Sequence, residues 1–285
     1  MARRSVLFTP GDRPEMLRKA PKSGADVIVF DLEDGVSPDR KQQAREGVVD
    51  ALSDPRFDPD CEVCVRTNAE PELRDADLEA LVDSGQLTLD GLMLPKTASA
   101  SDVQSVVDRL EEYATTVPIF ALIESASGVL EAPKIARVPE TTALVFGAED
   151  LSADIGATRT SAGTEVLYAR ERIVLAAAAA DIDAIDTVFT DFEDESGLRT
   201  ETSFAIQLGY DGKLAIHPAQ IEPINEAFVP EPADLEWARD VLAAKREADD
   251  IDRGAFEVDG EMIDAPLVAQ ANRILERAEL EDGEY

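Results

Sequence analysis

The chain is poor in basic residues, cysteine and histidine, and it has no long hydrophobic run. Its 285 residues include 27 Lys and Arg against 60 Asp and Glu, which gives a formal net charge of −33. A nucleic-acid partner requires a positive surface that faces the phosphates, so this charge excludes one. No segment approaches the roughly 20 apolar residues of a membrane span, and the N-terminal sequence lacks the apolar region of a signal peptide. We therefore expect a cytoplasmic protein with no membrane partner.

The two cysteines, Cys61 and Cys64, have a CEVC spacing that invites a redox or metal interpretation. A zinc site would need a second cysteine pair or a histidine cluster, and the chain has one histidine. Both cysteines fall in an apparent strand, CEVCVRTN, in which Val63 and Val65 alternate with other residues. We therefore interpret them as thiols in the core or at its edge.

The excess of acidic residues is spread over the whole chain, and lysine is scarce. Predicted helices such as DLEWARDVLAAKREADD carry acids among small apolar residues. This pattern is typical of the solvated surface of a protein from a very salty cytoplasm, where salt screens self-repulsion. A disordered acidic protein is the alternative, and the regular, frequent apolar segments exclude it.

The length and the hydrophobic fraction of 44% suit one large α/β domain. Short apolar runs predict eight strands, at residues 5–9, 26–32, 62–67, 91–95, 119–124, 143–147, 184–189 and 213–217. The segments between them have helix features, since several begin with Ser, Asp or Pro and some stop at Gly. Eight β–α units predict a (β/α)₈ TIM barrel. A doubly wound sheet competes, but no glycine-rich dinucleotide turn follows the first strand.

We assign the barrel to residues 1–228 and a C-terminal helical extension to residues 229–285. The extension contains an amphipathic helix, PEPADLEWARDVLAAKREADD, a turn or hairpin in RGAFEVDGEMID, and a final helix, APLVAQANRILERAEL. A barrel does not need this extension to close. We expect it to pack on its own barrel or over a neighbouring subunit.

Two acids follow apolar runs in a way that predicts a metal site. Glu124 closes VPIFALIES and Asp150 closes TALVFGAED, so we interpret both as carboxylates delivered by buried strands to their C-terminal ends. In a parallel barrel those ends form the active-site face. Two hard oxygen donors without a nearby Cys or His suit Mg²⁺ rather than Zn²⁺, with Mn²⁺ as a possible substitute.

Other polar residues end the remaining strands. Arg66 and Lys96 are two of the few basic residues, and each directly follows an apolar run. A guanidinium there can bind a carboxylate bidentately, and a metal with open positions can polarise the carbonyl of a 2-oxo acid for aldol-type chemistry. The competing interpretation is that loops are polar everywhere and that acids are common in this chain. His217 stands before a proline, where a structural role at the barrel rim is favoured over a catalytic one.

Several strings resemble the citrate lyase β-subunit family of the HpcH/HpaI aldolase superfamily, which includes malyl-CoA and β-methylmalyl-CoA lyases. They are SVLFTPGDRPEMLRKA, DVIVFDLEDGV, KQQAR, VRTN, GLMLPK, ALIESASGV, VFGAEDLSADIG, AIHPAQI and VDGEMIDAPLVAQANRIL. The resemblance runs from residue 4 to about residue 278, with the motifs in the family's order. It implies a TIM barrel, Mg²⁺ on Glu124 and Asp150, and Arg66 on the substrate carboxylate. It also implies CoA-thioester chemistry, in which an acyl-CoA enolate adds to a 2-oxo acid or the reverse cleavage occurs.

The resemblance also assigns roles to further residues. Asp264 in GEMID matches an aspartate that reaches the site of an adjacent subunit for acid/base catalysis, which implies a homo-oligomer, a trimer or a hexamer. Asp31, Glu33 and Asp34 match the DLED string, with tasks around the metal's water shell and the arginine. We assign Asp264, Arg66 and Asp34 to catalysis, and Arg66, Arg13, Lys96 and Glu33 to substrate binding. Arg13 follows the first strand and is the first choice for a CoA phosphate.

Within this family we predict a stand-alone lyase that converts β-methylmalyl-CoA or L-malyl-CoA to glyoxylate and propionyl-CoA or acetyl-CoA. This choice follows from the salt-adapted surface, which is an association and not a feature of the site. The alternatives are a citryl thioester lyase that releases oxaloacetate, a citramalyl-CoA lyase, and a partner-dependent subunit of a larger assembly. An aldolase for free 2-oxo acids is a further alternative, against which the C-terminal extension argues.

Overall fold

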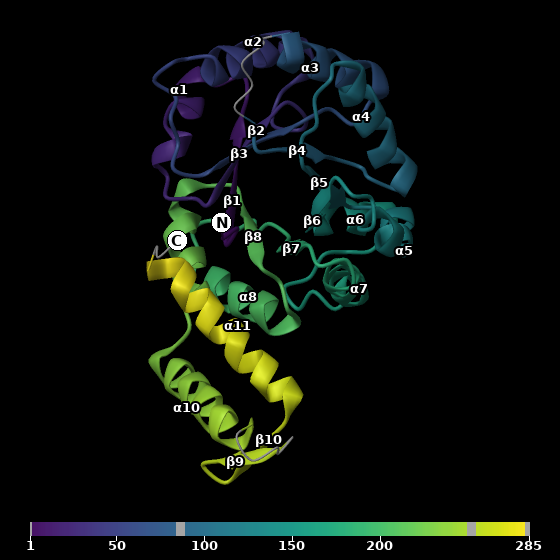
Figure 1. The fold of residues 1–285 in the computed structure, drawn as a ribbon. Coiled ribbons are helices and arrows are strands. Elements are labelled where there is room, and N and C mark those ends of the chain that lie inside the picture. The colour runs from purple at the N-terminus through teal and green to yellow at the C-terminus, as the bar shows by residue number, and fades with distance from the viewer. Residues whose placement is uncertain (1, 84–88, 250–254, 283–285) are drawn as a thin grey trace. The chain divides into compact units, whose positions relative to one another are not determined.

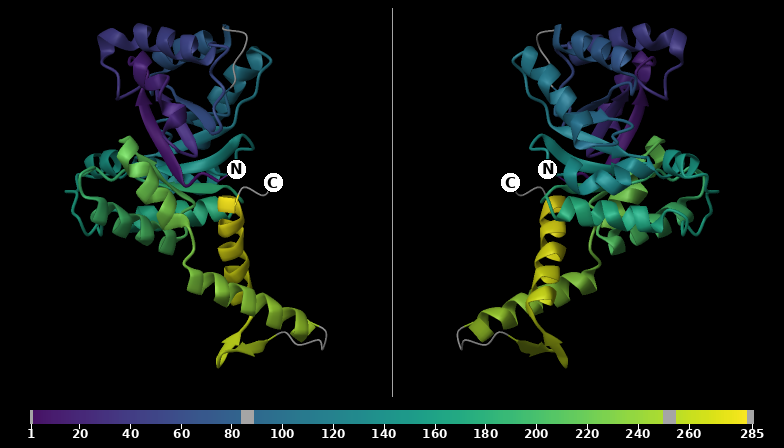
Figure 2. Two further views of the ribbon diagram at one scale, coloured as in Figure 1. Left: turned by 90° about the vertical axis from the view of Figure 1, so that its left-hand side faces the viewer. Right: turned by 90° about the vertical axis from the view of Figure 1, so that its right-hand side faces the viewer.

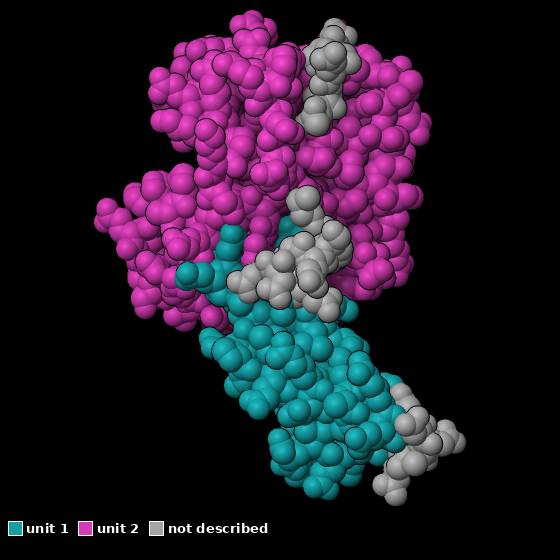
Figure 3. All heavy atoms as spheres, turned by 60° about the vertical axis from the view of Figure 1, so that its left-hand side comes forward, with its two compact units in different colours: residues 1–2, 225–285 teal, residues 3–224 magenta. Residues whose placement is uncertain are grey.

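The computed structural model describes residues 2–83, 89–249 and 255–282. The chain forms two compact units, which Figure 3 distinguishes by colour. One consists of residues 3–224, and the other of residues 1–2 and 225–285.

Eight parallel strands form a closed barrel in chain order (Figure 1). They are β1 (Ser5–Pro10), β2 (Val27–Asp31), β3 (Glu62–Arg66), β4 (Gly91–Leu94), β5 (Ile119–Ile123), β6 (Thr141–Phe146), β7 (Asp183–Asp186) and β8 (Gly212–Ala215). β1 pairs with β2 on one side and with β8 on the other, and this last pairing closes the sheet. Each predicted run overlaps one of these strands, and the predicted TIM barrel is confirmed.

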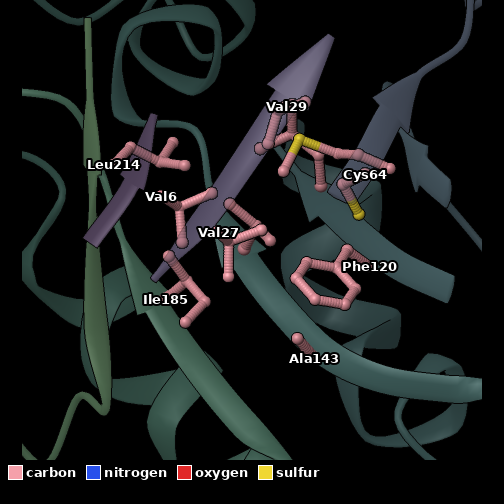
Figure 4. Packing of buried hydrophobic residues seen from close by; sticks show 11 residues of the cluster. Val6, Val27, Val29, Cys64, Phe120, Ala143, Ile185 and Leu214 are labelled. Atoms are coloured by element: carbon pink, nitrogen blue, oxygen red, sulfur yellow. The ribbon is translucent and has the colours of Figure 1, made fainter. Parts of the chain in front are cut away.

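Alternate residues of the strands fill the barrel's interior. Val6, Val27, Phe120, Ile185 and others pack there as one buried cluster (Figure 4). The strands are apolar on both faces because helices cover the outer face, as expected for a parallel sheet. Cys64 belongs to the interior cluster and Cys61 is half-buried. Both thiols are free, and burial raises the pKa of Cys61 to about 11 and that of Cys64 further, so neither favours the reactive thiolate form.

Helices connect the strands and cover the outside of the barrel (Figure 2). Those that the sequence predicted are α2 (Lys41–Leu52), α3 (Pro71–Asp83), α4 (Ala100–Glu112), α5 (Ala126–Ile135), α7 (Leu167–Ala178) and α8 (Glu195–Leu208). Side-chain caps fix two of their first turns, because Ser125 accepts from the amide of Gly128 and Asp194 from that of Gly197. Over the described residues, no helix is long and apolar enough to cross a membrane.

Three segments differ from the sequence prediction. The segment RPEMLRKAPKS lies between the first two strands, where helix features predict a helix, but it forms only one turn, α1 (Pro14–Leu17), followed by the 3₁₀ turn η1 (Ala20–Lys22). Pro21 has no N–H and disfavours α-helix in the residue before it. Two short helices were not predicted. They are α6 (Ala148–Asp154), which starts two residues after β6, and α9 (Ile221–Phe228), which follows the 3₁₀ turn η3 (Pro218–Gln220).

The second unit is built from two helices and a hairpin. It contains α10 (Pro232–Asp249), the antiparallel pair β9 (Phe256–Val258) and β10 (Glu261–Ile263), and α11 (Ala265–Asp282). Asp259 and Gly260 turn the hairpin with positive φ angles of 49° and 86°, as a two-residue Asp-Gly loop does. Of the predicted hairpin segment, residues 253–254 lie outside the described residues. Buried side chains from both helices and both strands make this unit's own core.

Candidate active site

Glu124 directly follows β5 and is buried, with 5% of its surface exposed. Its Oε1 accepts a 2.7 Å hydrogen bond from the backbone amide of Lys96, which follows β4. Lys96 has a φ of 52°, a left-handed conformation that is uncommon for a residue other than glycine. Burial raises the pKa of Glu124 to about 8, against the opposing effect of the Lys96 amide and ammonium.

Asp150 lies close to Glu124. It belongs to a short helix and not to the end of a strand. The strand β6 stops at Phe146, and Asp150 is the third residue of α6. Gly147 makes this approach possible, since a Cβ there would lie 2.6 Å from the Cβ of Glu124 and 2.8 Å from its Oε2. Asp150 thus follows the strand, as the sequence suggests, but it lies in a short helix that begins just after the glycine beside Glu124.

A positive group already joins the two carboxylates. Lys96 Nζ is 2.7 Å from Asp150 Oδ2 and 3.8 Å from Glu124 Oε1. Burial raises the pKa of Asp150, but its hydrogen bonds with Lys96 and Glu124 outweigh burial, so the pKa is lowered. A proton on this pair therefore favours Glu124 over Asp150.

This geometry fits a magnesium ion. Within the described ranges no three His, Cys, Asp or Glu side chains converge, so the protein offers two carboxylates rather than a full cage. Mg²⁺ commonly takes one or two carboxylates and completes its octahedron with water and substrate oxygens. The ammonium of Lys96 occupies the position between the two carboxyl groups that a metal ion would take.

Arg66 ends β3, and its guanidinium is held rigidly. Nε and Nη2 each donate a 2.7 Å hydrogen bond to the two oxygens of Asp31, and the guanidinium carbon lies 4.5 Å from the centre of the Phe8 ring. Burial lowers the pKa of Arg66, but the bonds to Asp31 outweigh it and raise the pKa. The Nη1 side is 3.3 Å from Glu33 Oε2. Asp31 therefore occupies the Nε–Nη2 edge of the guanidinium, and the Nη1–Nη2 edge is the one that it leaves open.

The DLED segment is anchored around Asp31. Its carboxylate accepts from the amides of Glu33 and Gly35 at 2.8 Å, and Lys41 Nζ donates to the carbonyls of Leu32 and Glu33. Burial raises the pKa of Glu33 to about 7, with Arg66 opposing. Asp34 is exposed, and in the part of the chain that the structure describes no side-chain hydrogen bond or ion pair holds it. Its charge acts on Glu33 and Arg66 through space.

Each of the other predicted residues has contacts of its own. Arg13 is exposed and pairs with Asp12 at 3.6 Å. His217 caps η3, because its Nδ1 accepts from the amide of Ala219, and its ring stacks on Phe192 with centroids 5.1 Å apart. These contacts support the structural interpretation of His217. Asp264 is exposed in the second unit, where its carbonyl accepts from Val268 in the first turn of α11.

Sequence reasoning missed Phe8, Lys41 and Gly147. Phe8 is one of many apolar residues in its strand, and nothing in the sequence links it to Arg66. Lys41 donates hydrogen bonds to backbone carbonyl groups, and such bonds do not depend on the identity of the accepting residues, so the sequence pattern does not reveal them. Gly147 did have a signal, because a glycine between an apolar run and an acid often marks a close backbone approach.

The comparisons with known proteins agree with this geometry. Residues 4–218 match the family model described as HpcH/HpaI aldolase/citrate lyase. The chain belongs to this family. A citrate lyase subunit beta-like protein of Deinococcus radiodurans is 39% identical over 95% of this chain and 96% of its own length. The mitochondrial citramalyl-CoA lyase of Homo sapiens is 37% identical over 94% of this chain and 83% of its own length.

A solved structure is similar over almost the whole chain. CitE of Mycobacterium tuberculosis, in complex with magnesium, acetoacetate and coenzyme A, matches with a TM-score of 0.82 and 37% identity, covering 98% of both chains. That structure contains magnesium, which is the metal that the sequence of this chain predicts. As a member of the HpcH/HpaI aldolase/citrate lyase family, the protein is a carbon–carbon lyase, the class to which aldolases and citrate lyases belong.

Proposed function

We propose that the protein is an Mg²⁺-dependent lyase that cleaves, and in reverse forms, the carbon–carbon bond of a 3-hydroxyacyl-CoA thioester. The observation that carries this proposal is the pair of buried Glu124 and half-buried Asp150, which share one ammonium, on a barrel that also fixes the guanidinium of Arg66. The human relative is named for citramalyl-CoA, and the CitE structure contains coenzyme A beside an oxo acid.

Each residue of the site has a role in this proposal. Glu124 and Asp150 would hold Mg²⁺, which polarises the oxygen of the 2-oxo acid when it is bound. Arg66 binds the carboxylate of that acid through its Nη1–Nη2 edge, beside Glu33 and Asp34. Lys96 moves from the carboxylate pair to the anionic substrate. Arg13 serves a CoA phosphate, since its side chain is exposed and cationic.

Acid/base catalysis completes the reaction. In cleavage, a base removes the proton of the 3-hydroxyl group, and the carbon–carbon bond breaks as the carbonyl of the 2-oxo acid forms. The electrons of that bond pass to the thioester enolate, which takes a proton at carbon and leaves as acyl-CoA. We assign this proton transfer to Asp264, contributed by a neighbouring subunit of a homo-oligomer.

The preferred substrate is the finer part of the proposal. The acidic surface led us to β-methylmalyl-CoA and L-malyl-CoA, which release glyoxylate. The name of the human relative favours citramalyl-CoA, which releases pyruvate, and that of the Deinococcus relative favours a citryl thioester, which releases oxaloacetate. Malyl-, citramalyl- and citryl-CoA differ in the group on the hydroxyl-bearing carbon, and β-methylmalyl-CoA differs from malyl-CoA by a methyl group on the neighbouring carbon. One enzyme preparation can therefore rank all four.

The test is a cleavage assay at high KCl with Mg²⁺ that offers the four CoA thioesters side by side. We expect turnover of at least one, with the oxo acid and the acyl-CoA released in equal amounts. Asp150→Asn should abolish it, while Glu79→Gln, an exposed acid on α3, should not change it. If folded, metal-loaded protein turned over none of the four thioesters, the proposal of a stand-alone lyase would be overturned in favour of a partner-dependent subunit.

A further inference from the structure

The first amide of the helix that carries Asp150 donates its hydrogen bond to a residue from a distant part of the chain. The first amides of a helix have no partner within it, and a side chain just before the helix usually supplies one. Gly147 holds that place in α6 and has no side chain to offer. The amide of Ala148, which is fully buried, donates instead to Thr187 Oγ1 at 3.1 Å, from 39 positions along the chain.

Thr187 is itself firmly held. It directly follows β7 and is 4% exposed. Its carbonyl accepts a 2.8 Å hydrogen bond from Lys213 Nζ of β8, whose ammonium also lies 2.8 Å from Asp186 Oδ2. Arg170 of α7 binds the two oxygens of Asp186 at 2.8 and 2.7 Å. A buried group of three charges thus fixes the backbone on which the Thr187 hydroxyl stands.

The first turn of α6 is therefore attached to the barrel at two points. The amide of Gly147 donates to the carbonyl of Ile123, the last residue of β5, at 3.0 Å. The amide of Ala148 is attached to the end of β7 through Thr187. Asp150 lies two residues further on, so the distance between its carboxylate and that of Glu124 depends on both attachments. Removing the hydroxyl would leave a buried N–H unpaired beside one metal ligand.

We propose that Thr187 is a positioning residue for the metal site: its hydroxyl sets the first turn of α6 so that Asp150 faces Glu124. The inference rests on the magnesium site of the proposed function. Thr187 acts on Asp150 through the amide of Ala148. Outer partners that orient metal ligands typically change metal affinity by 10–100-fold when they are removed.

The matched control is Thr141, at the opposite end of the strand that leads into α6. It is 2% exposed, and its hydroxyl donates to the carbonyl of Ile135 at 3.0 Å. Thr141→Val therefore removes a buried hydroxyl that also bonds to the backbone, as a donor rather than an acceptor, at the other end of β6 from Asp150. Thr187→Ser keeps the oxygen and removes only a methyl group, so it should restore what Thr187→Val loses.

The experiment measures Mn²⁺ binding to the full-length protein by electron paramagnetic resonance at fixed pH and salt. We expect Thr187→Val to bind at least about tenfold more weakly, and Thr187→Ser and Thr141→Val to stay within about twofold of the wild type. Equal affinity in Thr187→Val, or an equal loss in Thr141→Val or Thr187→Ser, would overturn the proposal. If Thr187→Val does not accumulate, Thr187→Ala is measured at low temperature against the same predictions.

Hydrogen exchange of the metal-free protein separates this inference from the metal assignment. Thr187→Val should speed exchange of the amides in residues 148–154 and leave those of α5 unchanged. Unchanged exchange in α6 would overturn the positioning role regardless of metal binding. Equal Mn²⁺ affinity in wild type and Asp150→Asn would instead overturn the metal site on which the inference rests.

Discussion

Glu124 and Asp150 have opposite pKa shifts although they share one site. Glu124 loses its water to burial and holds its proton up to a pKa of about 8, whereas the pKa of Asp150 is lowered by Lys96 and by Glu124 itself. We therefore expect Glu124 to donate a hydrogen bond as a carboxylic acid when the site is free of metal, and to bind the metal as a carboxylate. Binding of Mg²⁺ has to release this proton.

Metal affinity should consequently rise with pH. Below the pKa of Glu124 the proton competes with the metal, so we expect apparent Mg²⁺ affinity to increase between pH 6 and pH 8 and to level off above it, by roughly tenfold or less per pH unit. Calorimetric titration in buffers of different ionisation enthalpy measures both the affinity and the protons released. Glu124→Gln, which cannot ionise, should bind metal weakly at every pH. An affinity that is flat across this range in the wild type would contradict the assigned protonation.

The sequence predicts part of the residue-level site. Glu124 could be found because the strand before it is apolar and ends in an acid, and Arg66 because a basic residue is rare after such a strand. The hydrogen bonds from Arg66 to Asp31 join residues 35 positions apart. They could be expected only from the DLED motif and not from any local pattern. Nothing in the sequence pointed to Thr187, because its contribution is one hydrogen bond that its hydroxyl accepts from an amide 39 positions away.

At the scale of elements, strands were easier to predict than short helices. A strand that is buried on both faces is a continuous apolar run, and all eight runs were visible in the sequence. The segment AEDLSAD of α6 is too short for an apolar period, and its first hydrogen bond comes from another element. The sequence therefore places Asp150 after the right strand but does not predict the short helix that carries it.

Three elements are joined by the buried charges of Arg170 (α7), Asp186 (β7) and Lys213 (β8). Removing the shared carboxylate leaves two buried cations without their partner, so we expect Asp186→Asn to lower the free energy of unfolding by about 3–5 kcal/mol. Glu201→Gln is the control, because Glu201 contacts the same Arg170 at 3.3 Å but is partly exposed, and it should cost less than about 1 kcal/mol. Urea unfolding at constant KCl compares them. Equal losses would show that burial of the group of charges does not decide its contribution.

At the scale of the whole molecule, the net charge of −33 sets the conditions for folding. Like charges repel in the folded state, and salt screens this repulsion. We expect the unfolding temperature to rise by at least about 5 °C between 0.1 and 2 M KCl. Sucrose at equal osmolality is the control, since it does not screen charge. A temperature that rises as much in sucrose as in KCl would remove the electrostatic explanation.

The proposed role of Asp264 concerns more than one copy of the chain. Asp264→Asn and Asp150→Asn should each be inactive alone, because one lacks the proton-transfer group and the other a metal ligand. If a subunit supplies Asp264 to its neighbour, mixing the two variants under conditions that exchange subunits should restore activity, up to about a quarter of the wild type for random pairing. Mass spectrometry of differently labelled copies verifies the exchange. Exchange without recovered activity would place Asp264 in the site of its own chain.

The pairing of the first strand with the last has a consequence for synthesis of the protein. Ser5 pairs with Lys213, and the amide of Lys213 donates to the carbonyl of Arg4, so the two sides of this seam are made at nearly opposite ends of the barrel sequence. Until β8 leaves the ribosome, β1 presents an unpaired strand edge, and the half-built sheet has an open apolar interior. Such edges recruit other strands, so the nascent chain is open to misassembly for most of its translation. The net charge of −33 opposes association between copies of the chain.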